Sequence, residues 1–423
     1  MDFSALQYIL RLSPLFFLTL CCVDAFLVAT SNINEPQLLG KFHYASAAFS
    51  ALDKRSSGSG YDLILTSFGF SSDVSVVSDV GKFLSDVTKI APVSISKTLK
   101  WPNEVSAVPV QALNGHYVAI PDGFLVPTKT DGSIKVYNLN NPGSPLVTLS
   151  SHTGEWFYHR VLWVDMNKDG RLDALTCRAN KPLIGATKGE LVWFTSPPSK
   201  SLATPWPESI VANGPDIYFN LAHFKVGTKT YEAIVVAEFF SHKIRVYWSE
   251  DYRQDWSNKT YVKSRDIDVS MGAPFDVVIA DVNGDGHLDI LATTNSEHNG
   301  TVLVYEVPVD FRTGQFKRHR LADGYASQSM GLNKGGPGSP YVIPAPAGQK
   351  PSILVAGDDA AVLSLLTPKA PQNHTNWEYT RTDFLKTGTS TVGGISFADV
   401  DGDGRLELFV PSYDEGYVYV YRL

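Results

Sequence analysis

Long hydrophobic runs and an excess of positive charge are both missing from this sequence. The apolar run near the N-terminus, Leu15–Val23, is about half of the roughly 20 residues that a helix needs to cross a bilayer, and no later segment qualifies. The formal net charge is −7, so no basic stripe offsets the phosphate repulsion of a nucleic acid. We therefore expect neither a membrane span nor a nucleic-acid partner.

Cysteine is equally scarce, with three in the whole chain. Cys21 and Cys22 lie inside the apolar run, which follows Arg11 and ends at the small-residue segment Val23-Asp24-Ala25, a pattern typical of a signal peptide. We therefore expect residues 1–25 to be cleaved, the protein to be secreted and Cys177 to be the one cysteine that remains. A secreted chain without a disulfide draws its stability from a large core, a closed sheet or bound metal.

Three Asn-x-Thr sequons agree with a secretory route. They begin at Asn258, Asn299 and Asn373. Because such tripeptides are acceptors for N-linked glycans only in that route, we expect a glycoprotein.

Apolar, aromatic and turn-forming residues are plentiful. Hydrophobic residues make up 43% of the chain and aromatic residues 12%, with 33 Gly and 25 Pro. Ring and β-branched side chains suit pleated strands, while Gly and Pro mark the turns between them. The composition predicts an all-β fold with a large core, and no linker divides residues 26–423, so we expect a single domain there.

A segment rich in aspartate occurs three times at a nearly constant interval, as Asp165–Asp173, Asp281–Asp289 and Asp399–Glu407. So long an interval indicates a half-period, because repeats of about 20 to 50 residues mark propellers and arrays. Related segments that lack the acids are Ala222–Ala237, Val342–Gly357, Val110–Val126 and Phe49–Phe68. Together the segments predict seven units of roughly 57 residues each.

Each unit is predicted to hold four strands. The fifth unit shows them as Phe275–Ala280, Leu288–Thr293, Thr301–Glu306 and Phe316–Leu321, from the innermost strand to the outermost. The third-strand pattern recurs at Ser133–Tyr137, Leu191–Phe194, Lys243–Tyr247 and Tyr417–Tyr421. The pattern predicts a seven-bladed β-propeller of four-stranded blades.

The seventh unit lacks a fourth strand of its own, since the chain ends at Leu423. Phe26–Ala29 has the composition of a strand and belongs to no unit. We expect this N-terminal segment to pair beside Tyr417–Tyr421 and close the ring, which removes an open sheet edge.

The three acidic segments have the spacing of a calcium loop. Oxygen-bearing side chains at positions 1, 3, 5 and 9, with Gly at position 6, can surround one hard cation. The predicted side-chain ligands of about three Ca²⁺ ions are Asp165, Asn167, Asp169, Asp173, Asp281, Asn283, Asp285, Asp289, Asp399, Asp401, Asp403 and Glu407. The alternative is a set of metal-free turns, in which each Asp or Asn side chain bonds the local backbone.

The segments Val161–Leu175, Phe275–Leu291 and Phe397–Phe409 resemble the FG-GAP or VCBS repeat. The resemblance implies structural calcium sites, completed by the backbone carbonyls of Arg171, His287 and Arg405. Proteins with similar repeats include integrin α-subunit heads, fungal seven-bladed lectins and the propeller domain of aldos-2-ulose dehydratases. The fold therefore leaves the function open.

Chain direction places the turns after each second strand on the face opposite the acidic loops. The candidate ligand or catalytic residues there are His159, Glu238, His242, Glu297 and His298. His and carboxylate side chains on one face can bind a sugar or transfer protons, although they are also ordinary solvated loop residues.

Three functions compete at this point. We favour a binding module for carbohydrate or an extracellular protein, with the aromatic side chains Trp156, Trp193, Trp248, Trp256 and Trp377 available to stack on sugars. The alternatives are a sugar dehydratase or lyase with a His/carboxylate pair at the centre of the ring, and a purely structural or cell-surface interaction role.

Overall fold

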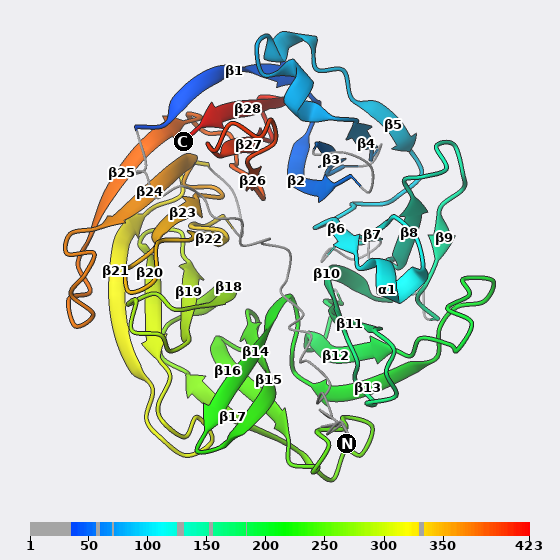
Figure 1. Cartoon of the computed structure of the whole chain (residues 1–423), viewed down its shortest axis with the longest axis vertical. Helices are drawn as coiled ribbons and strands as arrows, with labels where there is room; N and C mark the ends of the chain where they lie inside the picture. Colours follow the sequence, from blue (N-terminus) through cyan, green and yellow to red (C-terminus); the bar gives the residue numbers. More distant parts are fainter. Residues whose placement is uncertain are drawn as a thin grey trace, which may run out of the picture.

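Seven four-stranded antiparallel sheets form a ring in this computed structural model. The structure describes residues 35–423 apart from 56–59, 70–71, 125–130, 152–154, 183 and 330–333. Figure 1 shows the sheets as blades around a central axis, with the strands β2, β6, β10, β14, β18, β22 and β26 nearest the centre. The predicted seven-bladed β-propeller is confirmed.

The blades are numbered here in chain order. Blade 1 consists of β2 (Ala47–Lys54), β3 (Tyr61–Ser67), β4 (Val74–Val77) and β5 (Val93–Ser96), and blade 2 of β6 (Ser106–Val108), β7 (Tyr117–Pro121), β8 (Ile134–Asn138) and β9 (Val147–Thr148). Blade 3 consists of β10 (Phe157–Val164), β11 (Asp173–Asn180), β12 (Lys188–Phe194) and β13 (Glu208–Asn213), and blade 4 of β14 (Tyr218–Val226), β15 (Lys229–Glu238), β16 (Lys243–Ser249) and β17 (Val262–Asp268).

The other three blades follow the same order from the inside outward. Blade 5 consists of β18 (Ala273–Ala280), β19 (Asp289–Asn295), β20 (Gly300–Glu306) and β21 (Lys317–Tyr325), and blade 6 of β22 (Pro340–Ile343), β23 (Ser352–Ala356), β24 (Val362–Pro368) and β25 (Tyr379–Lys386). Blade 7 combines β26 (Ser396–Ala398), β27 (Glu407–Ser412) and β28 (Tyr417–Arg422) with β1 (Gln37–His43) from the start of the chain. The short helices are η1 (Val80–Phe83), η2 (Val87–Lys89) and α1 (Val110–Leu113).

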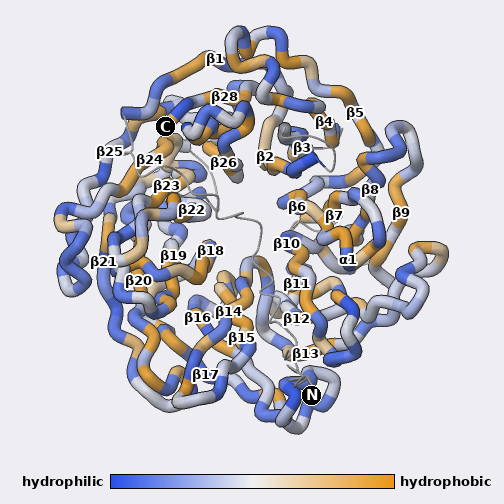
Figure 2. The backbone as a smooth tube through the Cα atoms, in the orientation of Figure 1, coloured by the Kyte–Doolittle hydropathy of each residue, from blue (hydrophilic) through white to orange (hydrophobic). Residues whose placement is uncertain are grey.

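The second and third strands of a blade are apolar on both faces because neighbouring blades cover both. In β11, every residue from Asp173 to Ala179 is buried. The outermost strand β21 is instead mostly polar and exposed. Figure 2 shows hydrophobic stretches around the whole ring. The core therefore consists of layers between blades, as the hydrophobic clusters that join residues of adjacent blades also show.

The ring closes through β1, which pairs antiparallel with β28 from Gln37 opposite Arg422 to His43 opposite Tyr417. An N-terminal closing strand was predicted, but the segment was wrong: Phe26–Ala29 lies outside the described residues, and the position beside β28 belongs to Gln37–His43. The predicted segment was chosen for its apolar composition, whereas the closing strand is an outermost one in which only Phe42 is buried.

The strands predicted for the fifth unit correspond to β18–β21. In blade 2 the predicted segment, Val110–Val126, begins after the inner strand of the blade. Val110–Leu113 forms the helix α1, and the inner strand is β6, which comes before it. Blade 2 has an inner strand of only three residues, too short for a periodic pattern.

No helix in the described part of the chain is long and apolar enough to cross a membrane. Cys177 lies on β11 as a free, fully buried thiol.

Phe42 tests the closure of the ring, because it is the buried residue of β1 and packs with side chains of blades 1 and 7. Phe42→Ala is expected to lower the free energy of unfolding by about 3–5 kcal/mol. Leu38→Ala, on the same strand but 51% exposed, is the matched control, with an expected change within about 0.5 kcal/mol. Denaturant unfolding measures both; equal effects would show that β1 does not close the core.

Candidate functional site

The three acidic segments form the same turn between the inner and second strands of blades 3, 5 and 7. In each, the carboxylate at position 1 accepts a hydrogen bond from the amide of the glycine at position 6: Asp165 from Gly170 at 2.8 Å, Asp281 from Gly286 at 2.8 Å and Asp399 from Gly404 at 3.0 Å. The three glycines have φ values of +88°, +87° and +86°, a conformation that favours glycine. The glycine at position 6 thus lets each loop turn back onto its first carboxylate.

The acid at position 9 anchors each loop to the second strand. Asp173, Asp289 and Glu407 are buried at the start of β11, β19 and β27 and accept backbone N–H groups from within their own loops at 3.0, 3.0 and 3.1 Å. Burial raises the pKa of each to about 7. A cation beside these carboxylates would offset that cost of burial.

The loops differ at position 3. In blade 7 the carboxylates of Asp399, Asp401 and Asp403 bring oxygen atoms within 4.8 Å of one another. In blades 3 and 5 this position is asparagine, and the amides of Asn167 and Asn283 both donate to the aspartate at position 5 at 2.9 Å.

An all-oxygen donor set fits Ca²⁺, so the residues present suit the predicted ion. The amides at position 7, from Arg171, His287 and Arg405, donate to the aspartate at position 5 at 3.0, 2.8 and 2.9 Å. The metal-free turn has these same internal hydrogen bonds, and calcium therefore remains a prediction.

The opposite face, which we call the return-turn face, holds the turns between the second and third strands. Glu297 and His298 lie there with side chains 66% and 86% exposed and 4.0 Å apart. His242 is also exposed, in the turn between β15 and β16. These three residues lie on the return-turn face, opposite the acidic loops, where the sequence placed them.

Glu238 is not exposed on the return-turn face. Its side chain is fully buried at the end of β15, where it accepts a hydrogen bond from Tyr247 at 3.1 Å and pairs with Lys243 at 3.3 Å. The residue was assigned to the turn, but β15 extends through it. Replacing Glu238 would therefore disturb the core of blade 4 rather than remove a ligand contact alone.

A pocket of about 280 Å³ lies between blades 3 and 4 on the return-turn face. Lys188 and Glu190 of β12, the segment after β13 and the residues Phe240 and Ser241 after β15 line it. Asp216, almost fully buried on its wall, accepts the amides of Phe239 and Phe240 at 2.9 and 2.8 Å. These hydrogen bonds fix the turn after β15 that forms one wall of the pocket, and the candidate residue His242 follows in the same turn.

His159 lies on the inner strand β10, with its ring edge-on to Tyr218 at 4.4 Å and Phe49 at 5.6 Å. Burial, with a smaller effect of the neighbouring Arg160 charge, lowers its pKa to about 3. Within the described residues, the buried Nδ1 atom has no hydrogen-bond partner and the ring has no carboxylate partner. The His/carboxylate pair required by the lyase alternative is therefore not formed by this histidine.

An ion cluster that the sequence did not reveal lies near the axis. The guanidinium of Arg160, on β10, donates to Glu104 at 2.9 Å and to Asp276, on β18, at 2.9 Å. It also lies over the Tyr218 ring, 4.4 Å from its centroid. The cluster joins blades 2, 3 and 5, which are not all neighbours, so it crosses the centre of the ring.

A second polar cluster joins blades 5, 6 and 7 on the return-turn face. Asp359 pairs with Lys334 at 3.0 Å and accepts from the Thr391 hydroxyl at 2.8 Å. Asp358 accepts from the amide of Asn295 at 3.1 Å, and burial together with the charge of Asp359 raises its pKa to about 8. These side chains tie the turns of three blades together.

The tryptophans are less available than the sequence suggested. Trp156, Trp193, Trp248 and Trp256 are at most 9% exposed and pack in the core. Trp377 is half-buried and stacks on the His319 ring at 4.2 Å. Core packing thus accounts for four of the five rings proposed as sugar platforms. The predicted glycan acceptors Asn258, Asn299 and Asn373 are all exposed.

The family model for the FG-GAP repeat matches residues 268–305, which run from the end of β17 through the acidic loop of blade 5 to β20. The other six blades share the topology of the matched one. The chain is therefore a seven-bladed β-propeller of the FG-GAP type. Among curated proteins, none matches the chain significantly.

The axial cluster yields a stability test, because the side chain of Asp276 is only 1% exposed. Arg160→Met leaves this carboxylate buried without its cation and is expected to lower the free energy of unfolding by about 3–5 kcal/mol. Arg245→Met, which breaks a half-exposed pair with Asp266, is the control and is expected to cost at most about 1 kcal/mol. Similar losses in denaturant unfolding would mean that the axial pair does not bind the blades together.

Proposed function

We propose that this propeller is a secreted, calcium-stabilised binding module whose ligand, a carbohydrate or an extracellular protein, binds on the return-turn face. The observation that carries the proposal is the difference between the turns on the two faces of the ring. One face repeats a single acidic turn in blades 3, 5 and 7, while the other has turns of different sequence and a pocket between blades 3 and 4.

Repetition of one turn fits a structural role, since the same backbone hydrogen bonds recur in all three copies. Variable turns on a rigid scaffold are where proteins place recognition. The match to the FG-GAP repeat is consistent with a binding module. The proposed secretion and the proposed calcium sites agree with each other, because extracellular fluid supplies the ion. The sequons are exposed and therefore accessible for glycosylation.

In the metal-bound protein, Asp281, Asn283, Asp285 and Asp289 would hold one ion, and the matching residues of blades 3 and 7 would hold the others. The ion would neutralise the converging carboxylates. The protein itself positions two of these carboxylates: the amide of Gly286 donates to Asp281, and the amide of Val282 donates to Asp289 at the start of β19.

Chelation tests the metal sites. A ligand that binds only the folded state at a hundredfold excess over Kd stabilises it by about 2.7 kcal/mol, so EDTA is expected to lower the melting temperature. Asp285→Ala is expected to lower it in calcium and to differ little from the wild type in EDTA. Asp323→Ala, an exposed aspartate on β21, is the matched control. A melting curve that EDTA leaves unchanged, with no calcium by elemental analysis, would leave the metal-free turn as the correct description.

Blocking the pocket tests the ligand face. Ser241→Trp places a large ring where Ser241 lines the pocket between blades 3 and 4 and is expected to abolish binding in a glycan-array and extracellular-protein screen. Ser199→Trp changes another exposed serine, which follows β12 on the acidic-loop side, and should retain binding. Both variants should melt like the wild type. Loss of binding only in Ser199→Trp would move the ligand to the acidic-loop face.

A further inference from the structure

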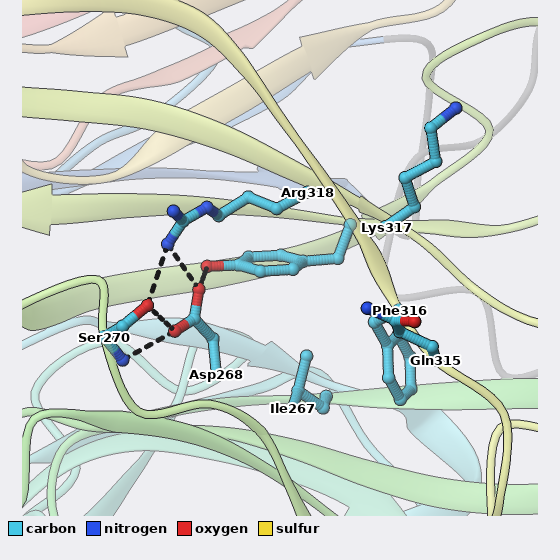
Figure 3. Close-up of a pocket in the computed structure, with 8 residues that line it drawn as sticks. Ile267, Asp268, Ser270, Gln315, Phe316, Lys317 and Arg318 are labelled. Atoms are coloured by element: carbon cyan, nitrogen blue, oxygen red, sulfur yellow. Dashed lines mark hydrogen bonds and ion pairs between the residues drawn. The ribbon is translucent and has the colours of Figure 1, made fainter.

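A second pocket, of about 600 Å³, lies at the outer edge of the ring between blades 4 and 5. Its walls come from the end of β17, from Tyr305 on β20 and from the start of β21 (Figure 3). Ligand pockets for small molecules generally have volumes of about 300–1,000 Å³. The pocket is therefore large enough for a sugar unit, and it lies apart from the return-turn pocket.

Arg318 is held in place at one end of its guanidinium. Its Nη1 atom donates to Asp268 at 2.9 Å and to Ser270 at 3.1 Å (Figure 3). In the part of the chain that the structure describes, its Nε and Nη2 atoms have no hydrogen-bond partner within the protein. This free edge carries two parallel N–H groups, the fork that matches two oxygens of a carboxylate or sulfate.

Asp268 cannot serve as a cation site, because its acceptors are already engaged. It accepts from the Tyr305 hydroxyl at 2.8 Å, from the backbone and hydroxyl of Ser270 at 2.6 and 2.8 Å, and from Arg318. Burial opposes its ionisation, yet these hydrogen bonds hold the pKa of Asp268 below its usual value. The aspartate thus stays charged and keeps Arg318 in position.

The rest of the pocket supplies an apolar side. The half-buried Ile267 lines it, and Phe316, which lies beside Ile267 in Figure 3 but packs in the core, is only 8% exposed there. Lys317 points away from Asp268 and pairs with Glu306 at 3.3 Å. Apolar surface beside a fixed cationic fork can contact the ring of an acidic sugar while the fork binds its charged group.

We infer that the pocket between blades 4 and 5 binds an anionic sugar unit, whose carboxylate or sulfate oxygens accept from Nε and Nη2 of Arg318 while its ring lies against the half-buried Ile267. This site is separate from the return-turn pocket of the proposed function. It lies at the outer edge of the ring, and the positive charge of Arg318 selects an anionic ligand. Asp268 and Ser270 are positioning residues that hold Arg318.

Three related probes test the ligand class: glucuronic acid, a glucose sulfate ester and neutral glucose, each titrated against the full chain by isothermal calorimetry or ligand-observed NMR. At least one of the two anionic sugars is expected to bind about tenfold or more tightly than glucose, which lacks the charged acceptor. The stronger of the two identifies a carboxylate or a sulfate as the recognised group. Equal binding of glucose, or no binding by any probe, would overturn the inference.

Arg318→Gln is expected to weaken binding of the anionic sugar about tenfold or more, because the charged fork is lost. Arg318→Lys retains the charge next to Asp268 and should fall between Arg318→Gln and the wild type, which keeps the test valid if Arg318→Gln fails to fold. Arg320→Gln is the matched control: Arg320 is on the same strand, exposed, and paired with Asp323 outside the pocket lining.

Equal weakening by Arg318→Gln and Arg320→Gln would point to diffuse charge attraction and refute the site. Ser241→Trp separates this inference from the proposed function, since it blocks the return-turn pocket and should leave anionic sugar binding unchanged. If Ser241→Trp abolishes that binding and Arg318→Gln does not, the anionic sugar belongs to the return-turn face.

Discussion

The pairing of β1 with β28 is the constraint on which the rest of this structure depends. A blade of four strands is covered on both faces only when it has two neighbours, so an open row of blades would expose the faces of the first and last. The β1–β28 ladder joins the first described strand to the last, and the cluster around Phe42 joins β1 to side chains of blades 1 and 7. Every turn and every pocket between blades takes its position from this closed ring.

Charged groups inside the ring obey a different rule from the apolar layers. Two buried acids show how donors surround such a group: Asp289 accepts hydrogen bonds from backbone amides of its own loop, and Asp276 accepts from the guanidinium of Arg160. The apolar layers join a blade only to its neighbours, whereas Arg160 links blades 2, 3 and 5. The axial cluster thus adds a restraint that stacking of neighbouring blades cannot supply.

The sequence predicted features that repeat or that local chemistry dictates. The strands of blade 5 and the positive φ of Gly170, Gly286 and Gly404 follow from a repeated pattern. The closing strand was misplaced because β1 is an outer strand with a mixed composition and one buried residue, so its composition does not mark it as a strand.

Contacts between residues that are distant in the sequence could not be predicted, for a different reason. Arg160 and Asp276 lie 116 positions apart and belong to no motif, although a charged residue in an apolar inner strand was a signal for a buried partner. The burial of Glu238 depends on how far β15 extends, and strand ends are where sequence patterns are least informative. Likewise, no local pattern separates a tryptophan in a layer between blades from one on the surface.

Geometry also explains where binding sites form on this ring. Blades diverge with distance from the axis, and their strands twist, so packing between neighbours is tightest at the inner strands and loosest at the outer ones. Near the axis, side chains such as Arg160, Tyr218 and His159 contact one another across blades. The two pockets described above instead lie at seams between neighbouring blades, lined by residues of third and fourth strands and of the segments that adjoin them. The exposed residues among them, such as Ser241 and Arg318, contribute little to the core and can change without unfolding the ring, so ligand specificity is expected to reside in them rather than at the axis.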